Sequence, residues 1–154
     1  MNYWLLKSEP STFSVDDLAR TRGKRTSWDG VRNYQARNLL RDRLAVGDQA
    51  FFYHSSCEVP GIAGIVSIVR AGYPDATAFD PGDDHYDADS DPAAPSWYTV
   101  DVRLERKLGR VITLEELRGH EKGKLKDLQL LRRGNRLSVL PVSAKDWRFI
   151  LSLE

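Results

Sequence analysis

The chain has 154 residues, of which 41% are hydrophobic and 29% charged, and its formal net charge is +1. This length fits one domain, residues 1–154, with a buried core. No apolar run approaches the roughly 20 residues that cross a bilayer, and no secretory signal is visible. The single cysteine, Cys57, excludes an internal disulfide and a multi-cysteine zinc site. We therefore expect a cytoplasmic or nuclear-type protein with no membrane contact, no metal and no cofactor.

Predicted strands and helices follow one another without a regular alternation. Strands are expected at residues 3–7, 49–54, 60–70, 97–108 and 137–142, the last ended by Pro141. Helices are expected to begin at Ser14, Thr113 and Ser143, where polar residues can cap the first turn, and a further helix is expected over residues 33–44. A basic loop is expected up to about Ser27. About five or six strands with single inserted helices predict an α+β fold, built as a small mixed barrel or curled sheet.

Charge is unevenly distributed along the chain. Residues 20–43 contain eight Lys or Arg side chains, opposed only by Asp29 and Asp42. Residues 73–96 contain seven aspartates and no Lys or Arg. A local basic field attracts polyanions even when the net charge is small. An ordinary solvated surface explains the same pattern, and the acidic loop could instead be a contact surface for another protein.

The stretch from Trp28 to Asn38 carries the clearest functional signal. It combines aromatic rings, amides and guanidinium groups with little aliphatic bulk, in the sequence Trp28-Asp29-Gly30-Val31-Arg32-Asn33-Tyr34-Gln35-Ala36-Arg37-Asn38. Rings stack on flat ligands, amides read hydrogen-bonding edges, and arginines hold phosphates. This mixture predicts a pocket for a planar, polar molecule beside an anionic backbone. For Trp28, a core position and a pocket-lining position are both open.

Three further groups of residues are candidates for a site. Lys7-Ser8-Glu9 follows a predicted strand end and could line a pocket mouth, or Glu9 could pair with an arginine. The turn Arg132-Arg133-Gly134-Asn135-Arg136 is basic and anchored by apolar neighbours. His54 and Cys57 have the residue types of a base and a nucleophile, although nothing in the spacing forces their contact. That pair supports a small hydrolase or transferase as an alternative function.

The chain resembles the EVE domain family, within the PUA-like superfamily that also includes the YTH and SRA domains. The resemblance covers nearly the whole chain. It is carried by several blocks in order: Tyr3-Trp4-Leu5-Leu6-Lys7-Ser8-Glu9-Pro10, the stretch from Trp28 to Asn38, Phe52-Tyr53-His54-Ser55, Pro60-Gly61-Ile62-Ala63-Gly64, Trp97-Tyr98, Val100-Asp101-Val102, and Leu130 through Val139. It implies a PUA-like mixed β-barrel of about five or six strands with peripheral helices.

The resemblance also implies a non-catalytic, nucleic-acid-binding domain that reads a modified base flipped into an aromatic-lined pocket. The partner is then DNA or RNA carrying a modified base, and the oligomeric state is left open. The implied base-binding residues are Ser8, Trp28, Val31, Asn33, Tyr34, His54 and Ser55. The implied phosphate-binding or pocket-bracing residues are Lys7, Arg32, Arg132, Arg133 and Arg136. Asp29 and Asp101 are the candidate partners of Arg32.

Overall fold

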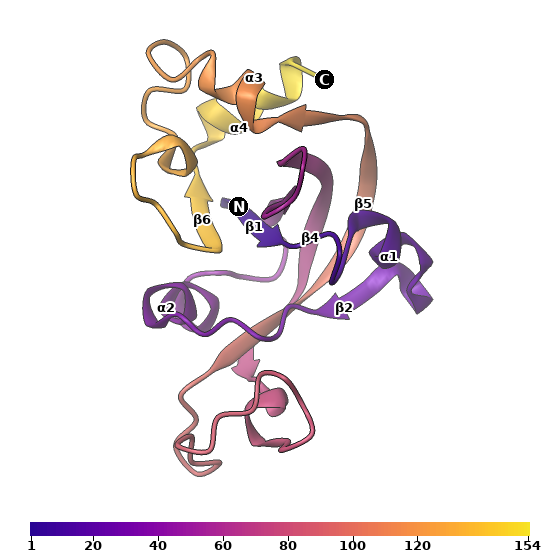
Figure 1. The fold of residues 1–154 in the computed structure, drawn as a ribbon, viewed down its shortest axis with the longest axis vertical. Helices are drawn as coiled ribbons and strands as arrows, with labels where there is room; N and C mark the ends of the chain where they lie inside the picture. The colour runs from indigo at the N-terminus through magenta and orange to yellow at the C-terminus, as the bar shows by residue number, and fades with distance from the viewer.

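The computed structural model describes residues 1–154 and contains one six-stranded mixed sheet with four α-helices around it (Figure 1). The strands are β1 (Tyr3–Ser8), β2 (Arg25–Ser27), β3 (Gln49–His54), β4 (Gly61–Pro74), β5 (Tyr98–Thr113) and β6 (Val139–Val142). The helices are α1 (Val15–Arg20), α2 (Tyr34–Asp42), α3 (Leu114–Arg118) and α4 (Ala144–Ser152). The α+β class and the number of strands expected from the sequence are confirmed.

The strand order is β2-β5-β4-β3-β1-β6, so β2 and β6 are the edges of the sheet. These edges do not pair with each other, so the expected barrel is not closed. The parallel pair β1 and β3 is joined through α1, β2 and α2, because parallel strands require a long crossover. Register shifts along β4 and β5 accompany the curvature of these two long strands, which is visible in Figure 1.

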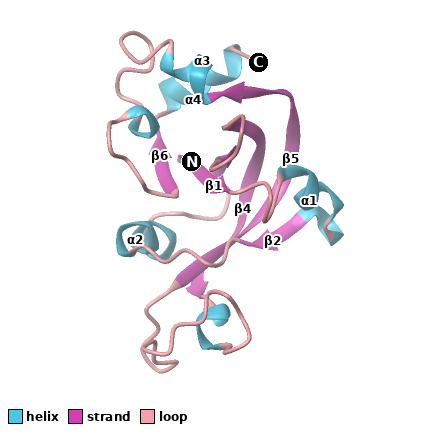
Figure 2. Cartoon of the chain, viewed as in Figure 1, coloured by secondary structure: helices cyan, strands magenta, loops and turns pink.

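The sheet buries a hydrophobic cluster on each of its two faces. Leu6 and Phe52 belong to one cluster, together with side chains of α1 and α2. Leu5 and Phe51 belong to the other cluster, together with side chains of α3 and α4. Neighbouring strand residues point to opposite faces, which explains this division. Figure 2 shows α3 and α4 together at the top of the molecule, with α1 and α2 below them on opposite sides.

The helix starts predicted from polar residues are confirmed. Ser14 accepts a hydrogen bond from the Asp17 backbone N–H, and the Asp17 carboxylate accepts one from the Ser14 N–H. Thr113 and Ser143 cap α3 and α4 through their side-chain oxygens. These bonds satisfy backbone donors that the first helical turn leaves free. None of the helices has the length and apolar content that a membrane span requires.

Two local predictions are wrong. The segment expected as a basic loop contains the short strand β2, which pairs with β5 at the edge of the sheet. Its three residues, Arg25 to Ser27, are too few and too polar to give a strand signal. Pro141 lies inside β6 and does not end it. Because β6 is an edge strand, the missing N–H of proline leaves no partner unpaired.

Candidate nucleic-acid interface

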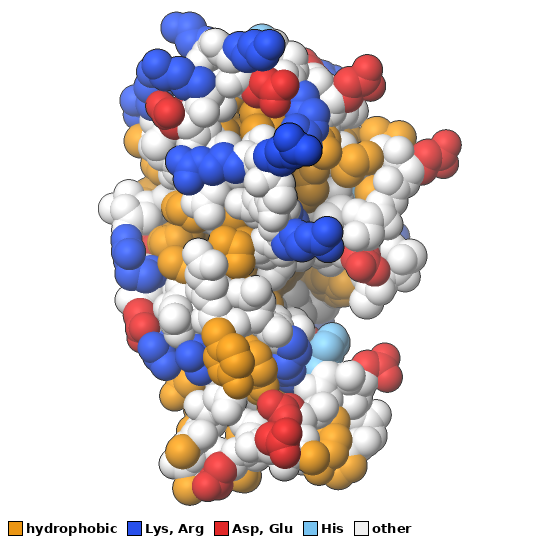
Figure 3. All heavy atoms as spheres, turned by 60° about the vertical axis from the view of Figure 1, so that its left-hand side comes forward, with side chains coloured by type: hydrophobic (Ala, Val, Ile, Leu, Met, Phe, Trp, Pro, Cys, Tyr) orange, Lys and Arg blue, Asp and Glu red, His pale blue; other side chains and the backbone are white.

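A cavity of about 580 Å³ opens where the end of β1 meets residues 26–32. It is lined by Lys7, Ser8, Glu9, Thr12, Phe13, Thr26, Ser27, Trp28, Asp29, Gly30, Val31, Arg32, His85 and Ser138. Figure 3 shows the surface hollowed beside a histidine. This volume lies within the range of sites that hold small organic ligands. A single nucleobase therefore has room in it.

Trp28 lies between the hydrophobic core and this cavity. Its residue surface is 7% exposed, and its ring meets the Phe52 ring edge-on, with centroids 5.2 Å apart. The Trp28 backbone N–H donates to the Val100 carbonyl at 2.8 Å, which ties the ring's position to the sheet. Trp28 is thus a largely buried residue that also lines the cavity. Both the core position and the pocket-lining position left open by the sequence apply to it.

Lys7 and Ser8 reach the cavity from the end of β1. The Ser8 hydroxyl donates to the Phe13 carbonyl at 2.5 Å, which leaves its oxygen lone pairs available as acceptors. Burial lowers the pKa of the Lys7 ammonium, and no carboxylate lies within ion-pair distance of it. Glu9 also lines the cavity and forms no ion pair. Of the two interpretations of the Lys7-Ser8-Glu9 trio, the pocket mouth is the one that the structure supports.

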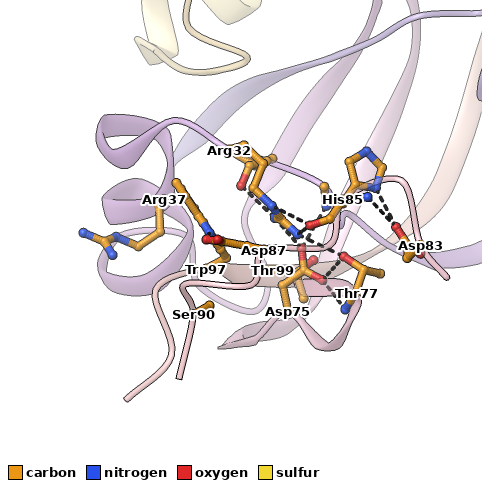
Figure 4. Close-up of polar contacts among 12 residues, drawn as sticks. Arg32, Arg37, Asp75, Thr77, Asp83, His85, Asp87, Ser90, Trp97 and Thr99 are labelled. Carbon is orange, nitrogen blue, oxygen red and sulfur yellow. Dashed lines mark hydrogen bonds and ion pairs between the residues drawn. The ribbon is translucent and has the colours of Figure 1, made fainter. Parts of the chain in front are cut away.

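Arg32 is braced by Asp75, and the two partners considered from the sequence are wrong (Figure 4). Its Nη1 lies 3.0 Å from Asp75 Oδ2, and its Nη2 lies 3.2 Å from Thr77 Oγ1. Asp101 instead accepts from Arg25 and from the Tyr73 hydroxyl. The guanidinium of Arg32 is therefore occupied within the protein, which fits a bracing role.

Asp75 is 1% exposed and fully engaged. It accepts hydrogen bonds from the Gly30 N–H at 2.9 Å, from Arg32, and from the Thr77 N–H and hydroxyl. Burial alone would raise the pKa of this carboxyl, but the hydrogen bonds from Thr77, Gly30 and Arg32 bring the net pKa below its usual value. A buried carboxylate with this many donors holds the backbone of residues 30–32 in place.

Asp29 also lies on the cavity wall, and the pKa of its carboxyl is shifted in the opposite direction from that of Asp75. It lines the cavity and accepts no hydrogen bond from the protein. Burial raises the pKa of its carboxyl, and the nearby charge of Asp75 raises it further. His85, from the acidic loop, lines the same cavity. His85 could not be identified as a site residue from the sequence, because no local pattern connects it with Trp28.

Four expected base-binding residues lie outside the cavity lining. The Asn33 amide oxygen accepts from the Ala36 N–H and caps α2, a role that its place before a helix could have revealed. The Tyr34 ring is 57% exposed and stacks on Trp97 with centroids 4.7 Å apart. His54 Nε2 accepts from the Val15 N–H at 3.1 Å, and the Ser55 N–H donates to the Ser8 carbonyl. All four support the surroundings of the cavity and do not line it.

The contact between His54 and Val15 bears on the alternative of a His54–Cys57 catalytic pair. The His54 nitrogen that accepts from Val15 is not free to accept a proton from a thiol. Burial also lowers the pKa of the His54 imidazole. No group of three His, Cys, Asp or Glu side chains is arranged as a metal site would require.

Arg132, Arg133 and Arg136 are exposed and form no ion pair. They lie between α3 and β6, in the segment that leads to the cavity residue Ser138. Figure 3 shows Lys and Arg side chains gathered on the upper part of one face. Unpaired surface guanidinium groups suit contact with phosphates.

Comparison with known proteins identifies the family. The EVE domain family matches residues 2–153. Thymocyte nuclear protein 1 of Gallus gallus is 46% identical over 167 residues, which cover 99% of this chain and 68% of that protein. A crystal structure of human THYN1 in complex with DNA containing 5-methylcytosine has a TM-score of 0.94, at 43% identity over 99% of this chain and 97% of that chain. A crystal structure of a Pseudomonas syringae protein is 48% identical, with a TM-score of 0.92 and 98% of each chain covered.

Both the family match and these identities span essentially the full chain. The mixed strands and peripheral helices expected from the resemblance are present, in a six-stranded sheet that is not closed into a barrel. The residues that carried the resemblance include the cavity residues Lys7, Ser8, Trp28, Val31 and Arg32. The chain belongs to the EVE domain family.

Proposed function

We propose that this protein binds DNA carrying a modified cytosine, with the modified base everted into the cavity beside Trp28, and that it catalyses no reaction. The observation that carries the proposal is the cavity beside Trp28 in a chain whose structural relative, human THYN1, was crystallised with DNA containing 5-methylcytosine. Several relatives are thymocyte nuclear proteins, which supports a location of this protein where it has access to DNA.

The cavity residues supply the interactions that an everted base needs. Trp28 contributes an aromatic surface, Ser8 a hydroxyl for the base edge, and Val31 an apolar wall. Eversion costs a few kcal/mol, and base–aromatic stacking returns roughly 1–3 kcal/mol. Edge hydrogen bonds and phosphate contacts must supply the rest.

Phosphate contacts are assigned to the basic residues around the cavity. Lys7 lies in the cavity without an acidic partner, and Arg132, Arg133 and Arg136 are exposed in the segment that leads to it. Arg32 is assigned to bracing, because Asp75 already holds its guanidinium group. Binding through these residues is sequence-independent and weakens as salt rises.

The test is a binding titration with matched duplexes at one fixed salt concentration. A duplex with one 5-methylcytosine, its unmodified counterpart and the RNA of the same sequence are compared for the wild-type protein. Burial of a methyl group contributes roughly 0.8 kcal/mol, so we expect about fourfold tighter binding of the methylated duplex from this term alone. A more favourable ratio would indicate a contact beyond simple burial.

The variant that tests the cavity is Trp28→Ala, which should weaken binding by about 5- to 150-fold, since stacking contributes about 1–3 kcal/mol. Trp28→Phe retains a ring and should lose less. Thermal unfolding of each variant shows whether the fold survives. Equal binding of methylated and unmodified DNA by the wild-type protein, or full binding by a folded Trp28→Ala protein, would contradict the proposal.

A further inference from the structure

His85 is the one cavity residue that comes from the acidic segment between β4 and β5. Its side chain is 42% exposed, so it is open to solvent and to a ligand. Sequence position gives it no connection with the remainder of the cavity, whose other lining residues come from 7–13, 26–32 and Ser138. Its presence there is a product of the fold.

The structure fixes His85 from several directions (Figure 4). Its carbonyl accepts from Arg32 Nε at 3.1 Å and from Arg32 Nη2 at 2.7 Å. Its backbone N–H donates to Asp83 Oδ1 at 2.8 Å. Its ring lies so close to Gly30 that a Cβ there would be 2.6 Å from two ring atoms. A side chain held in this way loses little conformational freedom when it binds a ligand.

These contacts also determine what the ring offers to the cavity. His85 Nδ1 lies 3.2 Å from Asp83 Oδ1, and a carboxylate oxygen only accepts, so Nδ1 carries the proton. In the neutral ring, Nε2 is then a hydrogen-bond acceptor. It has no hydrogen-bond partner in the protein. The preorganised ring thus presents an unused acceptor.

Asp29 provides a second unused acceptor on the same wall. Asp29 is exposed as a residue, and its carboxylate lines the cavity without an ion pair or hydrogen bond to the protein. Asp29 directly precedes Gly30, the residue against which the His85 ring packs. Two neighbouring acceptors suit a ligand that brings donors.

We propose that His85 and Asp29 make the cavity select a base with an exocyclic amino group over a base with a carbonyl at the same position. Cytosine presents an amino group at its C4 position, whereas thymine presents an oxygen there. An amino group donates to these acceptors, while a carbonyl oxygen facing them leaves every lone pair unpaired. The inference rests on the proposed function and names the residues that select the base.

The experiment compares DNA containing 5-methylcytosine with DNA containing thymine at the same position, both opposite guanine. The two bases share the 5-methyl group and differ in the amino group and the adjoining ring nitrogen. A mismatched thymine is easier to evert than a paired 5-methylcytosine. This difference cancels when the ratio of the two affinities is compared between protein variants, because every variant meets the same two duplexes.

We expect the affinity ratio of the wild-type protein to favour 5-methylcytosine more than the ratios of Asp29→Asn and His85→Phe do. Asp29→Asn keeps the size of the side chain and removes its charge, and it should reduce the ratio about tenfold, since a hydrogen bond to a charged group contributes that much. His85→Phe keeps a ring and removes the acceptor, and should reduce the ratio by about two- to tenfold.

Matched controls carry the same substitutions elsewhere. His120→Phe changes a histidine that packs on Phe149, and Asp84→Asn removes an exposed charge from the segment that contains His85. Both should leave the ratio unchanged. Trp28→Ala should weaken both duplexes to a similar degree, because stacking does not depend on the exocyclic group.

The outcomes separate this inference from the function on which it rests. An unchanged ratio in Asp29→Asn and in a folded His85→Phe protein, with binding retained, would overturn the amino-group selection and leave the proposed function standing. Because Asp29 is exposed, the Asp29→Asn substitution keeps the test valid even if the ring substitution unfolds the chain. Failure of the wild-type protein to bind either duplex would overturn both.

Discussion

Arg32 and Asp75 lie 43 residues apart in the sequence, yet Arg32 Nη1 is 3.0 Å from Asp75 Oδ2. The same carboxylate oxygen accepts from the Gly30 N–H at 2.9 Å. The ion pair therefore fastens the cavity wall that follows Trp28 to the acidic segment that carries His85. One side of the binding cavity depends on a contact between two parts of the chain that are distant in sequence.

Removing this carboxylate should change how stability depends on pH. The pKa of Asp75 is lowered in the folded protein, so its stabilising effect is present above the unfolded pKa of about 3.9 and is lost as pH falls through the folded value. Asp75→Asn should therefore destabilise the protein by about 2 kcal/mol at neutral pH and by progressively less below about pH 4. Urea unfolding at several pH values measures this difference.

Asp29 provides the control of opposite sign. The pKa of its carboxyl is raised in the folded protein, so the folded state becomes less favourable as pH rises from the unfolded pKa through the folded one. Asp29→Asn should thus become relatively more stable than the wild type as pH rises through that interval. The difference in stability from the wild type should therefore change with pH in opposite directions for Asp75→Asn and Asp29→Asn. A change in the same direction for both variants would contradict a lowered pKa of Asp75 in the folded protein.

Gly30 should tolerate alanine less well than another glycine with a similar backbone conformation. Gly30 has φ +81° and Gly134 has φ +77°, so alanine costs about 1–2 kcal/mol at either position. At Gly30 the new Cβ also meets the His85 ring, whereas at Gly134 nothing lies within 4 Å. We expect Gly30→Ala to be more destabilising by roughly 1–3 kcal/mol. Denaturant unfolding of the two variants gives this difference directly, and similar losses would show that the ring moves aside freely.

Phosphate contacts by Arg132, Arg133 and Arg136 should be measurable from the salt dependence of DNA binding. Each phosphate contact contributes about 0.9 to the slope of log affinity against log salt. Arg133→Gln should reduce the magnitude of that slope by about this amount and weaken methylated and unmodified duplexes alike. Arg148→Gln, on α4, is the matched control and should leave the slope unchanged. A slope that stays the same in Arg133→Gln would remove that residue from the phosphate-binding set.

Local sequence patterns predicted most of the elements because the causes of those elements are local. The alternation of Leu5 and Leu6 between two faces follows from the geometry of a strand. Ser14 and Ser143 cap helices through backbone groups only three residues away. Asn33 acts by the same rule: the helix from residue 33 was predicted, but Asn33 was assigned to base binding and not to the cap of that helix.

Tyr34 and His54 lie outside the cavity lining because each contacts a residue that is distant in the sequence. Tyr34 was expected to bind the base, but its ring stacks on Trp97, which comes from a distant part of the chain. His54 was also expected to bind the base, but its ring nitrogen accepts from the Val15 N–H. Nothing near either residue in the sequence indicates these partners, because the fold brings them together from separate elements.

By itself, the sequence determined the class of fold and the stretch around Trp28 that lines the cavity, and its resemblance to the EVE domain family indicated the family. The first two depend on short-range periodicity, on capping, and on residue types that suit a planar ligand beside phosphates. Only the tertiary structure decided that the sheet stays open, that Asp75 braces Arg32, and that His85 completes the cavity. The physical reason is that strand pairing and the satisfaction of buried charges depend on which distant segments meet, and no local pattern encodes that meeting.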